Sequence, residues 1–160
     1  MSKANPVHKL PAGEMLRLDR QLCFALYSAS LAMTKIYKPL LEPLNLTYPQ
    51  YLAMLVLWEG DGITVSDLGH RLQLDSGTLT PLLKRLEASG YVQRRRDSVD
   101  ERRVLLLLTP AGRALKAGAA KVPQQVLCAS ACSIDELTAL TQRLKTLRDE
   151  IQSFSIEAAA

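Results

Sequence analysis

The order of patterns between residues 64 and 108 constrains the fold of this 160-residue chain more than any other feature. Residues 64–67 (Thr-Val-Ser-Asp) have the spacing of a capping box and predict the start of a short helix. After a polar turn, a second helix is predicted to continue to Ala88. An alternating strand over 91–94, a charged turn and a returning strand over 104–108 then predict a β-hairpin. Helix, turn, helix and hairpin in this order are typical of a winged helix-turn-helix.

Long helices are predicted on both sides of this unit. Apolar residues recur at spacings of three and four from Glu14 to about Pro39, where proline is expected to end the helix. This helix is apolar on its other faces as well, which is typical of burial on more than one side. A last helix, opened by a capping box at Ser133, carries a heptad-like seam suited to packing against another long helix. We therefore expect a mainly α fold with a small β-hairpin, in which N- and C-terminal helices form a dimerisation region.

Composition narrows the class of protein. The net charge of +4 and the isoelectric point near 9.1 permit a nucleic-acid partner without requiring one. We expect no signal peptide and no membrane span, and therefore a soluble, cytoplasmic protein. Three cysteines are too few for a disulfide scaffold, and the two histidines lie far from them in sequence. No metal site and no cofactor are expected.

The second helix of the predicted pair has two chemically different faces. Leu79, Leu82, Leu83 and Leu86 share one face and would hold the helix to the core. Small hydroxyl groups early in a recognition helix and basic groups later suit entry into the major groove of DNA. The candidate DNA-binding residues of this helix are Ser76, Thr78, Thr80, Lys84 and Arg85.

The hairpin carries the densest charge in the chain. Its arginines are Arg94, Arg95, Arg96, Arg102 and Arg103, and its acids are Asp97, Asp100 and Glu101. Such a run is commonly a solvated hairpin with internal ion pairs. Directly after a helix-turn-helix pattern, we favour arginines that contact an adjacent, narrow minor groove.

These motifs resemble those of the MarR family of regulators. The stretch GTLTPLLKRLEASGYVQRRRDSVDERRVLLLLTPAGRAL, residues 77–115, is similar to the recognition helix and wing of that family. It includes a D-x-R motif at 100–102 and an L-T-x-x-G motif at 108–112. The resemblance implies a single MarR-type domain over 1–160 that forms a two-fold homodimer on a pseudo-palindromic DNA operator. It also implies that Arg102 reaches DNA and that Asp100 orients it.

The resemblance extends over nearly the whole chain. It implies dimerisation helices within 1–45 and 110–157, and a winged helix-turn-helix lobe over 46–109.

Cys23 lies among apolar residues in LDRQLCFALYSAS, near the start of the first long helix. A cysteine in such surroundings is commonly an inert core thiol. A helix N-terminus, however, stabilises a thiolate through its dipole and free amides, although Cys23 is expected to lie rather deep for a large effect. The phenols of Tyr37, Tyr48 and Tyr51 are further donors that would stabilise a thiolate.

Within the MarR family, the stretch LDRQLCFALYSAS…YKPLL…LTYPQY resembles the organic hydroperoxide regulators of the OhrR type. This resemblance implies that Cys23 is the reactive cysteine and that Tyr37 and Tyr48 donate hydrogen bonds to it across the dimer. It implies a repressor that an organic hydroperoxide releases from its operator. In a two-cysteine subgroup, a second cysteine at the position of Cys128 forms a disulfide with the reactive cysteine of the other subunit. Cys132 competes for this role.

Three other interpretations remain at this point. A MarR-type repressor released by a small aromatic ligand would carry these cysteines incidentally. A thiol peroxidase would use the same cysteine pair, but it would have no need of a recognition helix or an arginine-rich wing. An architectural DNA-binding protein would have no switch.

Overall fold

The computed structural model describes residues 12–157, so residues 1–11 of the expected N-terminal dimerisation region lie outside the described residues. Short helical segments precede and follow the first long helix: α1 (Ala12–Met15), the 3-10 turn η1 (Leu18–Arg20), α2 (Leu22–Leu41) and the 3-10 turn η2 (Glu42–Leu44). The elements that follow are α3 (Tyr48–Glu59), β1 (Ile63–Thr64), α4 (Val65–Leu72), α5 (Ser76–Ala88), β2 (Val92–Arg96), β3 (Val104–Leu108), α6 (Pro110–Ala119), α7 (Val122–Ser130) and α8 (Ile134–Glu157).

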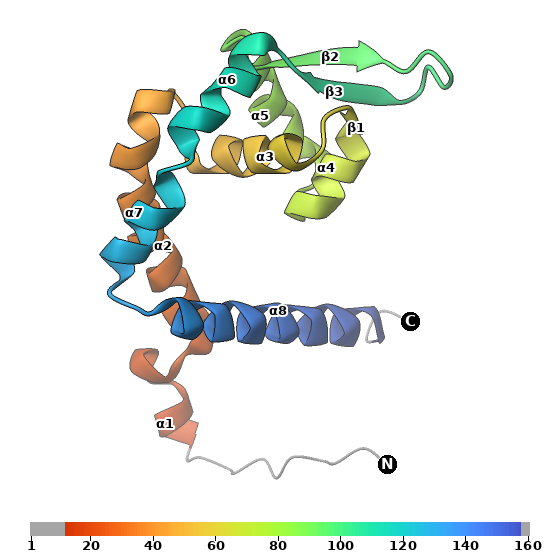
Figure 1. Ribbon diagram of the computed structural model, residues 1–160. Helices are drawn as coiled ribbons and strands as arrows, with labels where there is room; N and C mark the ends of the chain where they lie inside the picture. Colours follow the sequence, from red (N-terminus) through yellow and green to blue (C-terminus); the bar gives the residue numbers. More distant parts are fainter. Residues whose placement is uncertain (1–11, 158–160) are drawn as a thin grey trace.

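The elements separate into a lobe and a set of long helices (Figure 1). Helices α3, α4 and α5 lie beneath the β2–β3 hairpin, while α7 packs along α2 and α8 extends from the end of α7. The expected class, a mainly α winged helix-turn-helix fold, is confirmed. The sheet has one more strand than predicted. The short strand β1 pairs antiparallel with β3, which gives the order β1-β3-β2. The sequence did not predict β1, because a two-residue strand followed directly by a capping box is too short to show an alternation of apolar and polar residues.

The core of the lobe is built on the apolar face of α5. Leu79, Leu82, Leu83 and Leu86 are all buried, as the spacing predicted. They belong to one cluster with Leu57 of α3, Leu68 of α4 and the inward-facing residues of the sheet. Burying a leucine side chain contributes about 1.5–3 kcal/mol, so this face fixes the rotation of α5 about its axis.

The first long helix begins later than expected. The prediction of a helix from Glu14 is wrong: the backbone is extended at Arg17 and Gln21, and α2 starts at Leu22. Local side-chain bonds favour the break. The Gln21 amide donates to the carbonyl oxygens of Met15 at 2.5 Å and Arg17 at 3.2 Å. Cys23 is consequently the second residue of α2.

Two prolines differ in their effect. Pro39 does not end the helix as predicted but lies inside α2, which continues to Leu41. Leu41 is buried in the core, and this packing outweighs the single backbone hydrogen bond that Pro39 removes. Pro123 lies in the first turn of α7, after α6 has ended at Ala119. Its missing N–H costs little there.

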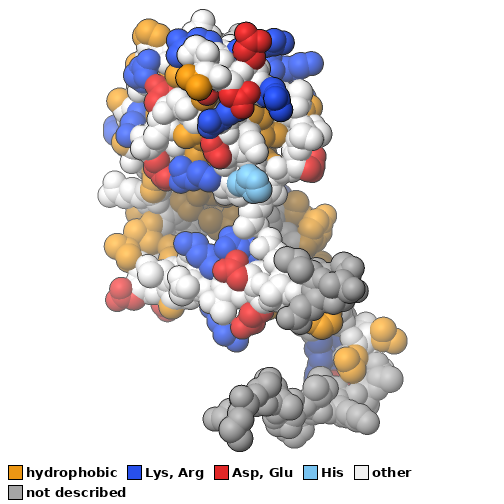
Figure 2. All heavy atoms as spheres, turned by 90° about the vertical axis from the view of Figure 1, so that its right-hand side faces the viewer, with side chains coloured by type: hydrophobic (Ala, Val, Ile, Leu, Met, Phe, Trp, Pro, Cys, Tyr) orange, Lys and Arg blue, Asp and Glu red, His pale blue; other side chains and the backbone are white. Residues whose placement is uncertain are grey.

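Large apolar side chains are exposed along the long helices of the single chain. On α2 they are Leu22, Phe24, Leu26, Tyr27 and Leu31; on α8 they are Ile134, Leu140, Leu144, Ile151 and Phe154. A space-filling view shows apolar side chains at several places on the lower part of the molecule (Figure 2). Among the described residues, no helix is long and apolar enough to span a membrane.

Gly112 allows α6 to approach the start of the wing. A Cβ at this position would overlap the carbonyl oxygen of Tyr91 and lie 3.0 Å from its carbonyl carbon. These are backbone atoms, which cannot move aside as the end of a flexible side chain can. The Gly112 carbonyl also accepts a hydrogen bond from the Trp58 indole at 2.9 Å. The L-T-x-x-G motif therefore reflects a steric requirement.

We predict that Gly112→Ala lowers the free energy of unfolding by about 2–3 kcal/mol, because overpacking forces α6 away from the sheet. The matched control is Gly60→Ala, since a Cβ at Gly60 meets nothing within 4 Å. Urea unfolding followed by circular dichroism measures both variants. Equal stability of the two would contradict the steric explanation.

Candidate DNA-binding surface and redox site

The recognition helix α5 is fixed at its N-terminus by Asp75. The Asp75 carboxylate accepts hydrogen bonds from the backbone N–H of Thr78 at 2.9 Å and from its hydroxyl at 3.0 Å. These bonds hold the pKa of Asp75 below its ordinary value, so the carboxylate stays charged at neutral pH. A negative cap at this end also complements the helix dipole. Thr78 is thus partly committed to the cap, although its oxygen can still accept a bond.

The other face of α5 is open to solvent. Among the sequence-predicted residues, the exposed ones on this helix are Ser76, Thr78, Thr80, Lys84 and Arg85. The Thr80 hydroxyl donates to the Ser76 carbonyl at 2.7 Å, which orients it along the helix. The structure therefore brings the hydroxyl and basic groups together on one surface, opposite the buried leucines.

The tip of the wing is held by its own aspartates. Asp97 accepts a hydrogen bond from the backbone N–H of Val99 at 3.0 Å, and Asp100 accepts one from the backbone N–H of Arg102 at 3.1 Å. Asp100 therefore orients Arg102 through the main chain. Val99, 93 % exposed, projects from the tip. The loop is ordered by short-range bonds typical of Asx turns.

The five wing arginines are not equivalent. Arg94 is bound to Glu87 of α5, and Arg103 lies 4.0 Å from Asp97. Within the described residues, no ion pair involves Arg95, Arg96 or Arg102, and all three side chains are exposed. In the part of the chain that the structure describes, the interpretation of the hairpin as a set of internal ion pairs therefore applies to one of its five arginines, Arg103, because Glu87 belongs to α5.

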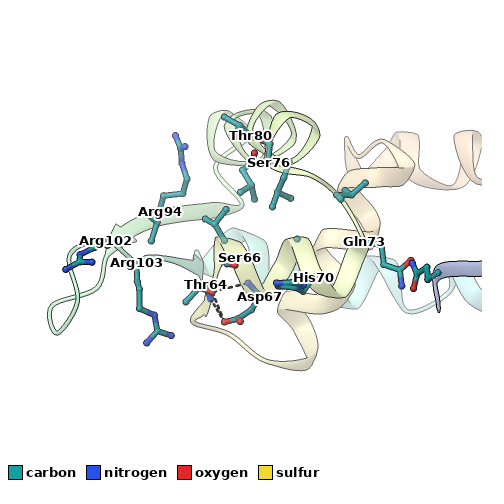
Figure 3. Close-up of a pocket in the computed structure, with 17 residues that line it drawn as sticks. Thr64, Ser66, Asp67, His70, Gln73, Ser76, Thr80, Arg94, Arg102 and Arg103 are labelled. Atoms are coloured by element: carbon teal, nitrogen blue, oxygen red, sulfur yellow. Dashed lines mark hydrogen bonds between the residues drawn. The ribbon is translucent and has the colours of Figure 1, made fainter. Parts of the chain in front are cut away.

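A groove of about 1050 Å³ lies between the recognition helix and the wing (Figure 3). Ser76 and Thr80 of α5 face it from one side, and Arg94, Arg102 and Arg103 of the wing line another. Thr64 of β1 and Ser66, Asp67 and His70 of α4 also line the groove. One end is bounded by Gln152 of α8, whose amide donates to the Gln73 side chain at 3.3 Å. The groove brings hydroxyl groups and cations from three separate segments to one concave surface.

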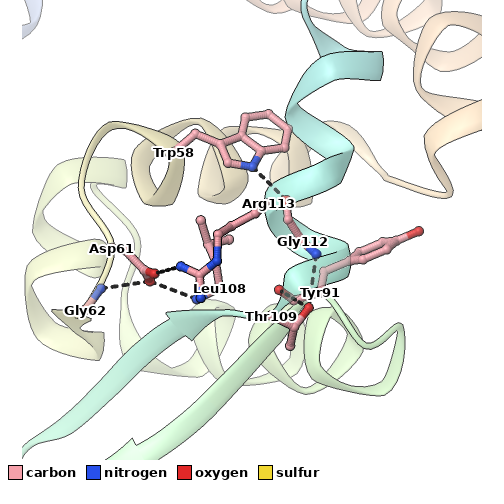
Figure 4. Close-up of polar contacts among 8 residues, drawn as sticks. All are labelled: Trp58, Asp61, Gly62, Tyr91, Leu108, Thr109, Gly112 and Arg113. Atoms are coloured by element: carbon pink, nitrogen blue, oxygen red, sulfur yellow. Dashed lines mark hydrogen bonds and ion pairs between the residues drawn. The ribbon is translucent and has the colours of Figure 1, made fainter.

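The base of the wing is joined to the lobe by a polar network (Figure 4). Asp61 accepts hydrogen bonds from the backbone N–H of Gly62 at 3.0 Å and of Leu108 at 2.8 Å, and it forms an ion pair with Arg113. Thr109 donates to the Gly90 carbonyl at 2.6 Å. The strands of the wing are thus tied to the turn after α3 and, through that turn, to α6.

Three tyrosines form an aromatic group where α2 meets α3. The ring centroids of Tyr37 and Tyr48 are 4.5 Å apart, and those of Tyr37 and Tyr51 are 5.9 Å apart. Burial raises the pKa of all three phenols. They therefore remain protonated at neutral pH and keep the O–H groups needed to donate hydrogen bonds.

Cys23 is exposed in the single chain and lies in the first turn of α2. The interpretations of this residue as a core thiol and as a deep helical position are both wrong for the isolated chain. Fourteen residues separate Cys23 from Tyr37 on the same helix, which corresponds to about 21 Å along its axis. Hence Tyr37 and Tyr48 lie together, but Cys23 does not join them within one chain.

The other two cysteines flank a helix end. Cys128 lies in the last turn of α7, and Cys132 lies beyond Ala131, whose left-handed φ of 55° ends that helix. Both thiols are exposed, and that of Cys132 is 3.3 Å from the Ser130 carbonyl oxygen. Across the described part of the chain, no three His, Cys, Asp or Glu residues form a group that could hold a metal ion.

The sequence reasoning missed Glu87 and the Asp61–Arg113 pair. Glu87 lies seven residues before Arg94, and Asp61 lies 52 residues before Arg113. Each pair joins residues from different segments of the fold, so no pattern within one helix or strand signals these contacts.

Comparison with known proteins gives one consistent result. The family model described as transcriptional regulator SarA/Rot matches residues 35–118. The regulator TtmR of Methylorubrum extorquens is 52% identical over 136 residues, covering 85% of this chain and 70% of TtmR. The organic hydroperoxide resistance transcriptional regulator of Bacillus subtilis is 50% identical over 136 residues, covering 85% of this chain and 92% of the relative.

Solved structures of AbfR of Staphylococcus epidermidis share the fold. Reduced AbfR bound to DNA has 34% identity and a TM-score of 0.73, covering 87% of this chain and 97% of AbfR. The disulfide form of AbfR has 38% identity and a TM-score of 0.59, covering 84% of this chain and 95% of AbfR. With its winged helix-turn-helix lobe and these relatives, the chain belongs to the MarR/SarA family of transcriptional regulators.

Proposed function

We propose that this DNA-binding regulator is a homodimeric repressor that senses organic hydroperoxides through Cys23 and then releases its operator. The observation that carries the proposal is the place of Cys23, exposed at the second position of α2. A thiol at this exposed position is accessible to a hydroperoxide from solvent. The name of the Bacillus subtilis relative and the disulfide form of AbfR support the same chemistry.

A second copy of the chain accounts for two features of the isolated one. The apolar side chains along α2 and α8 are more than a monomer usually exposes. If two α2 helices pair antiparallel about a two-fold axis, the start of each lies near the end of the other. Cys23 would then lie near the partner subunit's Tyr37 and Tyr48, whose phenols remain protonated donors.

A repressor that binds chromosomal DNA acts in the cytoplasm, which is the location we propose for this protein.

The chemistry proceeds in two steps. The Cys23 thiolate attacks the hydrogen-bearing oxygen of the hydroperoxide, the O–O bond breaks, and the alkoxide leaves and takes a proton from solvent to become an alcohol, which gives a sulfenic acid. The thiolate of the partner subunit's Cys128 then attacks that sulfur, an S–S bond forms, and the S–O bond breaks to release hydroxide, which takes a proton from solvent to become water. Because a disulfide requires Cα atoms about 4.4–6.8 Å apart, the helices that carry the two cysteines must approach. Such a movement would separate the two DNA-reading lobes from half-sites about one helical turn apart.

The DNA contacts of the proposed repressor divide between two elements. Ser76, Thr78 and Thr80 would meet base edges from the start of α5, while Lys84 and Arg85 would hold phosphates. The exposed Arg95, Arg96 and Arg102 of the wing would lie in or beside the flanking minor groove, with Asp100 fixing the backbone of Arg102. The family match leaves no support for the thiol peroxidase interpretation, since the matched proteins are transcriptional regulators.

Cys23→Ser is predicted to keep operator binding in the presence of cumene hydroperoxide, whereas the wild-type protein loses it. A serine hydroxyl cannot form a sulfenic acid, so the first step is blocked. Gel-shift titration with an operator duplex selected from random-sequence DNA measures the release. Release of the Cys23→Ser variant by the hydroperoxide would falsify the sensing mechanism. Release of that variant by a small aromatic compound alone would favour the ligand-operated alternative.

Cys128→Ser is predicted to abolish the disulfide-linked dimer that forms after hydroperoxide treatment, because no thiol remains to condense with oxidised Cys23. Cys132→Ser is the matched control, and it should still give the linked dimer. Non-reducing electrophoresis followed by mass spectrometry of the cross-linked peptide distinguishes the two. A Cys23–Cys132 peptide from the wild-type protein would instead assign the resolving role to Cys132.

Arg102→Gln is predicted to weaken binding to all DNA sequences and to reduce the slope of log K against log salt concentration by about 2, since each of the two subunits on the operator loses one phosphate contact. Arg143→Gln on α8, outside the proposed contact surface, is the control and should leave the slope unchanged. Fluorescence anisotropy across a range of salt concentrations gives both slopes. An unchanged slope for Arg102→Gln would remove this residue from the interface.

A further inference from the structure

Glu87 and Arg94 form the most extensive side-chain contact between the recognition helix and the wing within the described residues. The Glu87 carboxylate accepts hydrogen bonds from the backbone N–H of Arg94 at 3.2 Å, from its Nε at 2.9 Å and from its Nη2 at 2.5 Å. Both side chains are about one-third exposed, 33% for Arg94 and 35% for Glu87. The planar guanidinium is therefore held in one orientation, and the strand itself is bound through its backbone.

The register of the sheet explains why Arg94 differs from its neighbours. Residues directly opposite each other on antiparallel strands share a face. Val92 lies opposite Leu108 and Arg94 opposite Leu106, and these apolar partners are buried. Arg95 lies opposite Leu105 on the other face of the sheet. Arg94 thus points to the side that packs on the lobe, where α5 supplies Glu87.

The negative charge of Glu87 lies close to the proposed DNA-binding surface. Its hydrogen bonds with Arg94 hold the pKa of the carboxyl below its ordinary value, so the group is an anion at neutral pH. An anion beside a DNA-binding surface repels phosphates and weakens association. Binding alone would favour a neutral residue at the end of α5. The carboxylate is explained if its bond to the wing contributes more to operator binding than its charge costs.

We propose that Glu87 and Arg94 are a positioning pair that sets the angle between the recognition helix and the wing. Arg94 then acts through the wing and does not itself hold a phosphate, in contrast to Arg95, Arg96 and Arg102. The proposal rests on the proposed contact of both elements with DNA, and it is independent of the cysteine chemistry. By fixing the hairpin relative to α5, the pair would let the major-groove and minor-groove contacts form together.

The test is a double-mutant cycle on fully reduced protein. The probe is the operator duplex selected from random-sequence DNA, and the readout is Kd by fluorescence anisotropy. We expect Glu87→Ala and Arg94→Ala each to weaken binding by about 5- to 20-fold, and the double variant to be no weaker than either, as for residues that act only as a pair. The exchanged pair, Glu87→Arg with Arg94→Glu, should recover part of the affinity, because the side-chain ion pair can form again but an arginine at position 87 cannot accept the backbone N–H of residue 94.

Two matched variants separate positioning from simple charge effects. Arg95→Ala removes the neighbouring cation on the other face of β2, and its loss should add to that of Glu87→Ala. Glu101→Ala removes a wing carboxylate that forms no ion pair among the described residues, and it should tighten binding slightly. Tighter or unchanged binding by Glu87→Ala would overturn the proposal, because a direct phosphate contact by Arg94 predicts that outcome.

A footprint provides a readout that a loss of overall stability would not produce. With Glu87→Ala, hydroxyl-radical protection of the flanking minor groove should fade while protection around the major-groove half-site persists. Uniform loss of both would overturn the positioning role. Arg102→Gln, measured on the same probe, reports independently whether the wing reaches DNA, so failure of the positioning pair is distinguishable from failure of the proposed interface.

Discussion

The packing of one leucine face decides most of what this protein can do. Leu79, Leu82, Leu83 and Leu86 fix the rotation of α5, because turning that face toward water would expose four large side chains. Every polar group on the opposite face is consequently displayed outward. The hydroxyl and basic groups of α5 therefore face solvent because the leucines on the opposite face are buried. No further interaction is needed to direct these groups outward.

The wing depends on the same core but needs additional fixation. The buried side chains of Leu106 and Leu108 hold β3 against the core. At the base of the hairpin, Asp61 binds β3 to the turn after α3, and Thr109 binds to the turn after α5. Gly112 lets α6 approach this base without a steric conflict. Glu87 adds a side-chain link higher on the hairpin. The recognition helix and the wing thus keep one relative orientation, as the proposed contact with adjacent grooves requires.

The redox site has a different organisation, because it is incomplete in one chain. The two tyrosines implied as donors lie in contact, while Cys23 is separated from them by about 21 Å along α2. The same helix exposes a row of apolar side chains that a partner would cover. We infer that dimerisation and sensing share α2, so that a change in the bond made by Cys23 acts directly on the subunit interface and hence on the spacing of the two DNA-reading lobes.

The sequence by itself determined the elements whose signals are local. Capping boxes at Thr64 and Ser133, the leucine spacing of α5 and the alternation of the hairpin all rest on neighbours within one or two turns, and the structure contains each of them. Tertiary structure alone decided the passage of α2 through Pro39, the added strand β1 and the bond from Glu87 to Arg94, while the side-chain bonds of Gln21 favoured the start of α2 at Leu22. These features depend on contacts between different elements of the fold or on competing hydrogen bonds of similar energy. The periodic spacing of apolar residues in the sequence carries no information about such contacts and bonds.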